Sequence, residues 1–202
     1  MIAVIDYGAG NLHSVKNAFD YIGVQSEITS DAKRILAADK VVLPGVGAFG
    51  DCMRSLEKNN LAETVKAAAA SGKPFLGICL GLQLLFEESE ETPGVKGLGI
   101  FKGKSVRIPD TAALKIPHMG WNNIETAKKS KILDGNPFVY FVHSYCIKPE
   151  DESIISAYTE YGSRFAVAVE KDNVFAVQFH PEKSGSEGMD ILRRFAALGG
   201  DR

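Results

Sequence analysis

The sequence predicts an α/β fold with a central, mixed, mostly parallel sheet flanked by helices. In the first half of the chain, short apolar runs alternate with stretches of helical periodicity, which is typical of βα units on a parallel sheet. In the second half, strands follow one another through short turns. The length of 202 residues is that of one ordinary domain, so we expect a single domain over residues 1–202.

Local signals predict the elements of the first half. An Asn side chain can cap a helix and a Gly can end one, so Asn11 and Asn60 are predicted caps, and Gly23 and Gly72 are predicted ends. Between these signals, apolar side chains recur at helical spacing. Strands are predicted at residues 2–5, 41–43 and 75–78, and helices at residues 12–22 and 61–70.

The second half, after an acidic loop at residues 87–91, reads mainly as strands. Lys171, Asp172 and Asn173 form a predicted hairpin turn. The chain closes with a helix that carries Met189, Leu192 and Phe195 on one face and ends at residues 199–200. Strands are predicted at residues 138–145, 154–158, 165–169 and 174–179.

Composition excludes several classes of protein. Apolar residues make up 45% and charged residues 24% of the chain, as in folded globular proteins. The formal net charge of −2 comes without a basic stripe, so nucleic acid is not an expected partner. We find neither a signal-peptide core nor an apolar stretch long enough to span a membrane, and we expect a cytoplasmic protein. The three cysteines lack the spacing of a disulfide framework or a metal site.

Cys79 stands in the sequence context of a nucleophile elbow. It lies between the apolar run at residues 75–78 and a helical run at residues 82–86. Gly77 and Gly81 flank it, as a sharp turn with close backbone approaches requires. Free N–H groups at a helix start favour a thiolate, and the N–H of Leu80 can face a developing oxyanion. Cys52 and Cys146 lack this context and are predicted to be buried structural residues.

A nucleophilic cysteine needs a base, and His180 is the histidine with the best context. It ends an apolar run and precedes Pro181, so its backbone is predicted to be extended. Residues two apart in an extended segment face the same side, which places Glu182 beside the imidazole. Cys79, His180 and Glu182 are therefore a candidate catalytic triad.

Residues 45–50 spell G-x-G-x-x-G after a strand, the pattern of dinucleotide-binding loops. That pattern also requires a second strand ending in an acidic residue about twenty residues on. The sequence there is helical instead, which disfavours NAD. We expect the flexible backbone of Gly45, Val46 and Gly47 to lend a second N–H group to an oxyanion hole.

At these residues the chain resembles the class I, triad-type glutamine amidotransferases, which implies their single-domain, flavodoxin-like fold. Over its whole length it is similar to their subfamily of glutaminase subunits of imidazole glycerol phosphate synthase. The motifs that carry this resemblance are residues 5–11 (IDYGAGN), 44–49 (PGVGAF), 117–122 (PHMGWN), 141–145 (FVHSY) and 180–184 (HPEKS). Leu82 stands where the family often has methionine, an exchange of one apolar residue for another.

The resemblance implies hydrolysis of glutamine through a Cys79 thioester, with His180 protonating the departing ammonia and Glu182 orienting His180. It implies that glutamine is held by Gly47, Gln83, Ser144 and Tyr145, with Val46, Gly47 and Leu80 at the oxyanion. No metal or cofactor is implied. The implied partner is a (β/α)₈-barrel cyclase subunit, which uses the ammonia to make imidazole glycerol phosphate and an aminoimidazole carboxamide ribotide in histidine biosynthesis.

Residues 117–122 carry Met119 and Trp121 on either side of Gly120, and such a segment is often a turn packed in the core. The resemblance instead implies that these residues contact the cyclase, together with Asn11 and Lys183. His118 and His143 are expected to serve structure and not proton transfer.

Three alternatives stay open from the sequence. The chain could be a stand-alone γ-glutamyl hydrolase or peptidase-like enzyme, which needs no partner. It could be a non-catalytic binding or regulatory subunit of the same fold. It could also serve another synthase, such as the anthranilate or pyridoxal phosphate system, although the match at residues 117–122 argues against this.

Overall fold

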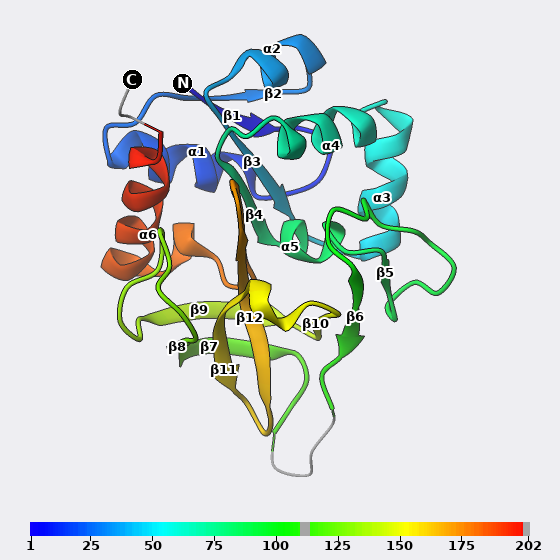
Figure 1. Cartoon of the computed structure of the whole chain (residues 1–202), viewed down its shortest axis with the longest axis vertical. Coiled ribbons are helices and arrows are strands. Elements are labelled where there is room, and N and C mark those ends of the chain that lie inside the picture. The colour runs from blue at the N-terminus through cyan, green and yellow to red at the C-terminus, as the bar shows by residue number, and fades with distance from the viewer. Residues whose placement is uncertain (110–113, 200–202) are drawn as a thin grey trace.

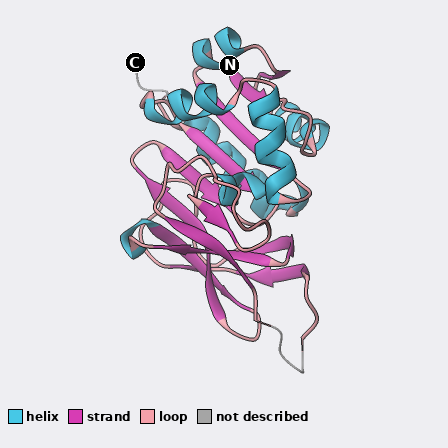
Figure 2. Cartoon of the chain, turned by 90° about the vertical axis from the view of Figure 1, so that its right-hand side faces the viewer, coloured by secondary structure: helices cyan, strands magenta, loops and turns pink. Residues whose placement is uncertain are grey.

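The computed structural model describes residues 1–109 and 114–199 of the chain. Within these residues the chain forms one large mixed sheet with helices on both faces and a two-stranded ribbon beside it (Figures 1 and 2). Its order is β2-β1-β3-β4-β13-β12-β10-β6-β5, with β11 and β8 attached through β12 and the ribbon made of β7 and β9. This is the predicted α/β class with a mixed sheet.

One half of the sheet is parallel and carries the helices. Its strands are β2 (Ser26–Thr29), β1 (Ile2–Ile5), β3 (Lys40–Gly45), β4 (Phe75–Cys79) and β13 (Val174–Val177). The helices are α1 (Leu12–Tyr21), α2 (Ala32–Ala37), α3 (Phe49–Lys58), α4 (Ala62–Ala70), α5 (Leu80–Leu84) and α6 (Gly185–Ala197). Because carboxyl ends of parallel strands share one edge, the loops after β3, β4 and β13 meet there.

The other half, which lies mainly in the lower part of Figure 1, is antiparallel apart from the short parallel pair of β5 and β6. It starts where β12 pairs with β13 across the Lys171–Val174 turn, as predicted for residues 171–173. The remaining elements are β5 (Glu88–Ser89), β6 (Gly103–Arg107), β7 (His118–Asn123), β8 (Glu125–Thr126), β9 (Phe138–His143), β10 (Tyr145–Pro149), β11 (Ile155–Glu160), β12 (Arg164–Lys171) and the 3₁₀ turns η1 (Glu152–Ile154) and η2 (Pro181–Lys183).

The core has two parts, one on each face of the parallel strands. Successive strand residues point to opposite faces, so Val41 and Leu43 pack with α3 and α4 while Val42 packs with α1 and α6. The aromatic side chains Phe49 and Phe75 are fully buried on one face, and Phe195 is fully buried on the other. Apolar burial on both faces fixes the parallel strands, whose ends carry the site.

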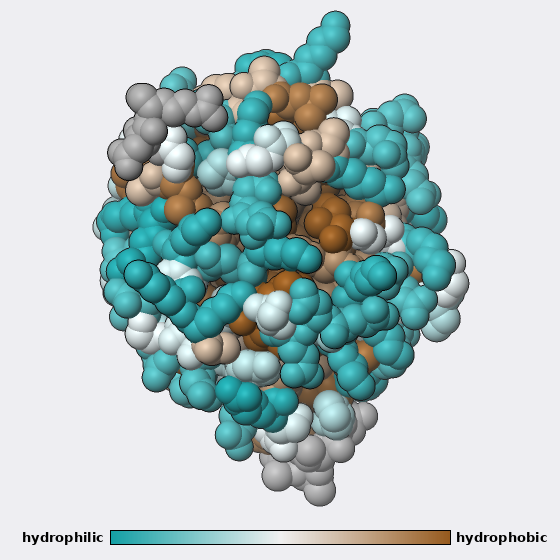
Figure 3. Space-filling view, viewed as in Figure 1, coloured by the Kyte–Doolittle hydropathy of each residue, from teal (hydrophilic) through white to brown (hydrophobic). Residues whose placement is uncertain are grey.

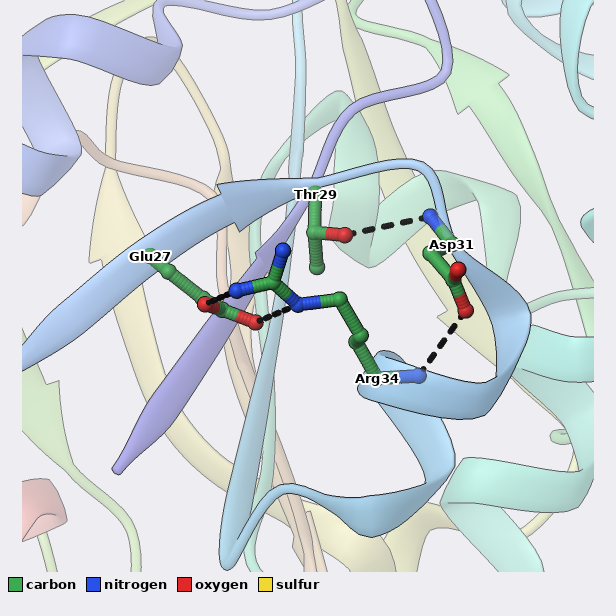
Figure 4. A network of polar contacts seen from close by, with 4 residues as sticks. All are labelled: Glu27, Thr29, Asp31 and Arg34. Carbon is green, nitrogen blue, oxygen red and sulfur yellow. Dashed lines mark hydrogen bonds and ion pairs between the residues drawn. The ribbon is translucent and has the colours of Figure 1, made fainter.

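At the edge of the parallel half, a polar network joins β2 to α2 (Figure 4). Asp31 caps α2 by accepting hydrogen bonds from the backbone N–H groups of Lys33 and Arg34. The Arg34 guanidinium forms a bidentate ion pair with Glu27, and the N–H of Asp31 donates to the Thr29 hydroxyl at 3.1 Å. The cap stabilises this short helix by about 1 kcal/mol, while the exposed ion pair adds less.

Several sequence predictions need correction. Asn11 makes no side-chain capping bond to α1, and α4 begins at Ala62 with Leu61, not Asn60, at its cap position. Asn60 has a φ of 55° and instead forms the left-handed turn that follows α3. The alternative of a core-packed turn at residues 117–122 does not hold either, because β7 runs through Gly120 and pairs with β9.

Among the described elements that had no counterpart in the prediction are β2, α2, α3 and β6. The start of α3 shows why local signals failed there. Its N–H groups at Phe49 and Gly50 are capped by the Glu91 carboxylate at 2.7 Å and the Thr92 hydroxyl at 3.2 Å, both far along the chain. The face in Figure 3 is mostly hydrophilic with separate small apolar areas. Among the described residues, no helix is long and apolar enough to cross a membrane.

Candidate active site

Cys79 lies at the turn between β4 and α5. Its backbone has φ 57° and ψ −114°, a strained conformation for a residue with a side chain. A Cβ added at Gly81 would lie 2.0 Å from the Leu43 carbonyl oxygen, and one at Gly77 would lie 3.0 Å from the Gly81 oxygen. The two flanking glycines are therefore required by close backbone contacts, as the elbow pattern predicted.

His180 lies just beyond β13, the parallel neighbour of β4, so the sheet brings it to the same edge as Cys79. Its Nδ1 is 2.8 Å from Oε1 of Glu182, and the two side chains are 2% and 1% exposed. His180 itself is extended, as predicted before a proline, but Glu182 lies in the 3₁₀ turn η2 and not in an extended segment, so this turn brings the two side chains together. Nε2 of His180 has no hydrogen-bond partner within residues 1–109 and 114–199, so it is left to exchange a proton with a reacting group.

The charge state of His180 follows from its neighbours. Burial acts to lower its pKa, but the nearby Cys79 sulfur and the hydrogen-bonded Glu182 carboxylate outweigh burial and raise the pKa to about 10. At neutral pH the ring is therefore an imidazolium. Such a ring can stabilise a thiolate and give a proton to a departing amine.

A cavity of about 320 Å³ opens beside these groups, within the usual size range of small-molecule sites. It brings together residues that are far apart in the sequence. The predicted residues that line it are Val46, Gly47, Cys79, Leu80, Gln83, Ser144, Tyr145 and His180, and the further lining residues are Glu91, Pro117, Val142 and His143.

Two backbone segments border the cavity where an oxyanion would form. Gly45 pairs with Cys79 in the β3-β4 register, which places the following loop beside the nucleophile. Gly47 has a φ of 96°, accessible to glycine, and the Cys52 thiol donates to the Val46 carbonyl at 3.4 Å. Carbonyl and N–H of one peptide point in opposite directions, so the Gly47 N–H faces away from Cys52. Leu80, the first residue of α5, has an N–H without an intrahelical partner.

A pair of buried histidines backs the cavity. Nδ1 of His143 lies 2.9 Å from the Tyr145 carbonyl, and Nε2 of His143 lies 2.9 Å from Nδ1 of His118. Nε2 of His118 lies 3.3 Å from the Asn122 amide nitrogen. A carbonyl only accepts and an amide nitrogen only donates, so both rings are neutral with Nδ1 protonated. Burial lowers the pKa of His118 to about 4 and that of His143 to about 3.

The predicted partner-contact residues lie on adjoining elements. Met119 and Trp121 on β7 are 61% and 49% exposed, so they are not packed in the core. The Trp121 ring stacks on exposed Phe138 of β9, with centroids 6.0 Å apart. A Cβ on Gly185, two residues after exposed Lys183, would lie 3.8 Å from the Trp121 ring. Half-buried Asn11 precedes α1, which packs on η2.

Comparison with known proteins identifies the family. The model of the glutamine amidotransferase class-I family matches residues 3–198. An imidazole glycerol phosphate synthase subunit HisH from Methanothermobacter thermautotrophicus is 50% identical over 200 residues, covering 98% of each chain. The HisH subunit from Aquifex aeolicus is 51% identical over 196 residues, covering 95% of this chain and 94% of its own. The chain belongs to the HisH family of class I glutamine amidotransferases.

Solved structures support the fold. A crystal structure of a glutamine amidotransferase superposes with a TM-score of 0.76 at 18% identity, covering 99% of this amidotransferase and 100% of that chain. The PurLQS structure from Thermotoga maritima gives a TM-score of 0.74 at 19% identity, with 96% of each chain covered. At these identities the similarity concerns the fold alone.

Two residues of this amidotransferase site were missed in the sequence. The Glu91 carboxylate lies at the cavity while capping α3, and no local pattern predicts that position. Gln178 donates from Nε2 to the Cys79 sulfur at 3.7 Å. A signal for Gln178 was available, because a glutamine inside an apolar strand is a buried polar group that needs partners. Among the described residues, no group of three His, Cys, Asp or Glu could hold a metal ion.

Proposed function

We propose that this amidotransferase is the glutaminase subunit of an imidazole glycerol phosphate synthase, with residues 1–202 acting as one domain. It hydrolyses glutamine to glutamate and ammonia and supplies the ammonia to a cyclase subunit. The observation that carries the catalytic part is the buried His180–Glu182 pair, whose unpartnered Nε2 lines the same cavity as the strained Cys79. The 50% identity to HisH subunits over nearly the whole chain carries the choice of synthase.

In the proposed reaction, the Cys79 thiolate attacks the carboxamide carbon of glutamine. The negative charge on the oxygen faces the Leu80 N–H and an N–H of the 46–47 loop. When the tetrahedral intermediate collapses, its C–N bond breaks and His180 protonates the leaving nitrogen as ammonia. Water then attacks the thioester, His180 accepts the water proton, and glutamate leaves with Cys79 regenerated.

Substrate recognition follows from the cavity walls. Glutamine carries an α-ammonium and an α-carboxylate besides its reacting amide. Among the described residues that line the cavity, Glu91 carries the acidic side chain. Its carboxylate is held at the start of α3 and complements the charge of the ammonium. Gly47, Gln83 and the backbone of Ser144 and Tyr145 supply the remaining polar contacts.

For the partner, we propose a (β/α)₈-barrel cyclase that docks over Met119 and Trp121, with Asn11 and Lys183 at the rim. Exposed stacked aromatic rings beside a basic side chain are typical of interface anchors. Met119 and Trp121 lie on β7, which pairs with β9. Val142 and His143 of β9 line the cavity, so a partner bound to β7 would lie one strand away from the cavity wall.

The test is glutamine hydrolysis by the purified chain, alone and with a cyclase subunit, followed as glutamate release. We expect slow hydrolysis alone and faster hydrolysis in the complex. Fast hydrolysis by the isolated chain, unchanged by the cyclase, would support a stand-alone hydrolase instead. No hydrolysis under either condition would support a non-catalytic binding subunit.

A further inference from the structure

Gln178 is a fully buried polar side chain in contact with the nucleophile, and the mechanism above does not use it. It directly follows β13, two residues before His180, and is 0% exposed. Its backbone N–H donates to the Val167 carbonyl at 2.8 Å, so the segment is held within the sheet. Its carboxamide lies between Gln83 and the sulfur of Cys79.

The hydrogen-bond network fixes which end of the Gln178 carboxamide faces the sulfur. The Tyr145 carbonyl only accepts, so Gln83 must direct its NH₂ group there, at 3.4 Å. The same NH₂ group of Gln83 donates to Oε1 of Gln178 at 3.0 Å, and Ser105 donates to Oε1 of Gln83 at 3.4 Å. Gln178 consequently presents its oxygen to Gln83 and its NH₂ group to Cys79.

We propose that Gln178 is a further catalytic residue of this site, which holds the Cys79 sulfur as a thiolate by donating an N–H to it from an orientation set by Gln83. The inference rests on the proposed glutaminase function. It gives the site a neutral donor to the thiolate besides the His180 imidazolium.

The chemistry needs no further reactant. When Cys79 ionises, its S–H bond breaks, the electron pair stays on sulfur and the proton goes to solvent, because the neighbouring His180 ring already carries both of its protons at neutral pH. A hydrogen bond to the charged form of a group favours that form, and the low exposure of Cys79 strengthens the interaction. The other ionisable groups near this sulfur are His180 with Glu182 behind it, Glu91, His143 and Tyr145 on the cavity wall, and Tyr7 and Cys52 below the 45–47 loop.

The test measures the rate of Cys79 alkylation by iodoacetamide as a function of pH, which requires no glutaminase activity. Gln178→Met keeps the length of the side chain and removes the donor. We expect the midpoint of the labelling profile to move upward by about one pH unit, with roughly tenfold slower labelling below it, since hydrogen bonds to charged groups are of this strength. Gln178→Glu keeps the acceptor for Gln83 and places an oxygen against the sulfur, so its upward shift is larger.

Gln25→Met is the matched control, because Gln25 is exposed on the loop before β2. Its labelling profile and its hydrolysis rate stay at the wild-type values. Unchanged midpoints in both Gln178 variants, with thermal melting preserved, would overturn the inference. A shifted profile in a chain that never hydrolyses glutamine would leave the inference standing and remove the proposed function.

The inference is also tested without altering Gln178, so a poorly folding variant does not leave it open. The side-chain amide protons of Gln178 in the wild-type NMR spectrum should shift across the pH range in which labelling of Cys79 rises. Cys79→Ala abolishes that shift. If the chemical shifts of the Gln178 amide protons in the wild-type chain stay constant while Cys79 ionises, the contact between Gln178 and Cys79 is contradicted.

Discussion

At the scale of single residues, the three cysteines differ through their surroundings and not through burial. All three are buried and free. Burial raises the pKa of Cys52 and raises that of Cys146 to about 11, so both stay as thiols at neutral pH. Cys79 alone combines a strained elbow with an imidazolium and a cavity. The reactivity of a cysteine follows its thiolate form, so the chemistry is assigned to one of three similar side chains.

The first prediction concerns these cysteines. Cys79→Ser abolishes glutamine hydrolysis without lowering the melting temperature by more than a few degrees, because the side chain fills nearly the same space. Cys52→Ser keeps a donor to the Val46 carbonyl, and it and Cys146→Ser retain most of the activity. Labelling with a glutamine-like diazo-ketone, followed by peptide mass mapping, should modify Cys79 alone. A label on Cys146 would overturn the assignment.

The second prediction separates the roles of His180 and Glu182. His180→Asn is as damaging as loss of Cys79, because the ring transfers protons in both half-reactions. Glu182→Gln keeps a hydrogen-bond acceptor at Nδ1 but removes the charge that stabilises the imidazolium, so hydrolysis falls by roughly 10²-fold or more, yet less than in His180→Asn. Glu187→Gln, at an exposed position of α6, is the control and keeps full activity. Full activity in Glu182→Gln would show that another group orients the ring.

At the scale of elements, the β7-β9 ribbon joins the exposed apolar face to the cavity. Residues on β9 alternate between exposed or half-buried and buried, from Phe138 to His143. The Tyr140 carbonyl accepts the backbone N–H of His180 at 3.0 Å, which ties the ribbon to the catalytic turn. Both neutral histidines also lie within this ribbon.

The third prediction follows from this exposed face. Trp121→Ala or Met119→Ala weakens binding of the cyclase by about tenfold or more, since anchors of this size typically contribute more than 1 kcal/mol. The fold is retained, because neither side chain is in the core. Leu36→Ala, an exposed apolar position on α2 away from the ribbon, is the matched control and binds normally. If both ribbon variants lose much of their melting temperature while their folded fraction binds the cyclase normally, Met119 and Trp121 serve packing and not partner binding.

The fourth prediction concerns pH. The pKa values of His118 and His143 are about 4 and 3 in the folded chain, below the unfolded value of about 6.5. At a pH between the folded and unfolded pKa values, the unfolded chain binds more protons than the folded chain. The contribution of the two neutral histidines to the free energy of unfolding is therefore complete above about pH 6.5 and is lost as the pH falls. Because unfolding takes up as many as two protons in this range, the free energy of unfolding falls by up to about 2.7 kcal/mol for each pH unit of acidification. His180 is protonated in both states below pH 6.5 and adds nothing there.

Denaturant unfolding between pH 4.5 and 7 measures this slope. His143→Gln should lower it by about one proton, whereas His13→Gln, at an exposed position, leaves it unchanged. A slope that is the same in all three proteins would mean that the buried pair does not titrate as the geometry requires.

The sequence predicted elements where the signal is local. β1, β4 and the turn at Asp172 were confirmed, because apolar runs and turn residues lie within a few positions of each other. β7 was not predicted as a strand, because Gly120 suggests a turn there, but pairing with β9 places this glycine within a strand at a φ of 125°, which glycine adopts readily. The start of α3 could not be predicted from local sequence either, because its cap is Glu91, which lies far along the chain.

The candidate site shows the same limit. The elbow and the His180–Glu182 contact could be predicted because each lies within a few residues. Gln178 and Glu91 act through partners 99 and 42 residues away, Cys79 and Phe49 respectively, and no single-segment pattern contains such pairs. The catalytic, oxyanion and partner-contact roles stay predictions until the variants are measured.

At the scale of the whole molecule, the β7-β9 ribbon carries both the exposed apolar side chains of Met119 and Trp121 and two residues of the candidate cavity, Val142 and His143. The loop at Gly45 to Gly47 borders the cavity, and glycines on both sides of Val46 leave its peptides free to rotate. Val46 itself is 40% exposed and β-branched, and β-branched residues favour an extended backbone, so we expect the resting loop to direct an N–H away from the oxyanion. A partner shifts this loop only if it binds the active orientation more tightly than the resting one. Ammonia released without an acceptor is wasted, so such control suits a glutaminase subunit.

The fifth prediction is the measurement that tests the central claim most directly. Glutamine hydrolysis is measured for the chain alone, with empty cyclase, and with cyclase carrying its ribonucleotide substrate or a stable analogue. A missing oxyanion donor costs roughly 10²–10³ in rate, so we predict an acceleration of that order in the third condition and slow hydrolysis in the first. Three rates that agree within about twofold, less than half a kcal/mol of barrier, would contradict the account of this chain as a partner-controlled glutaminase.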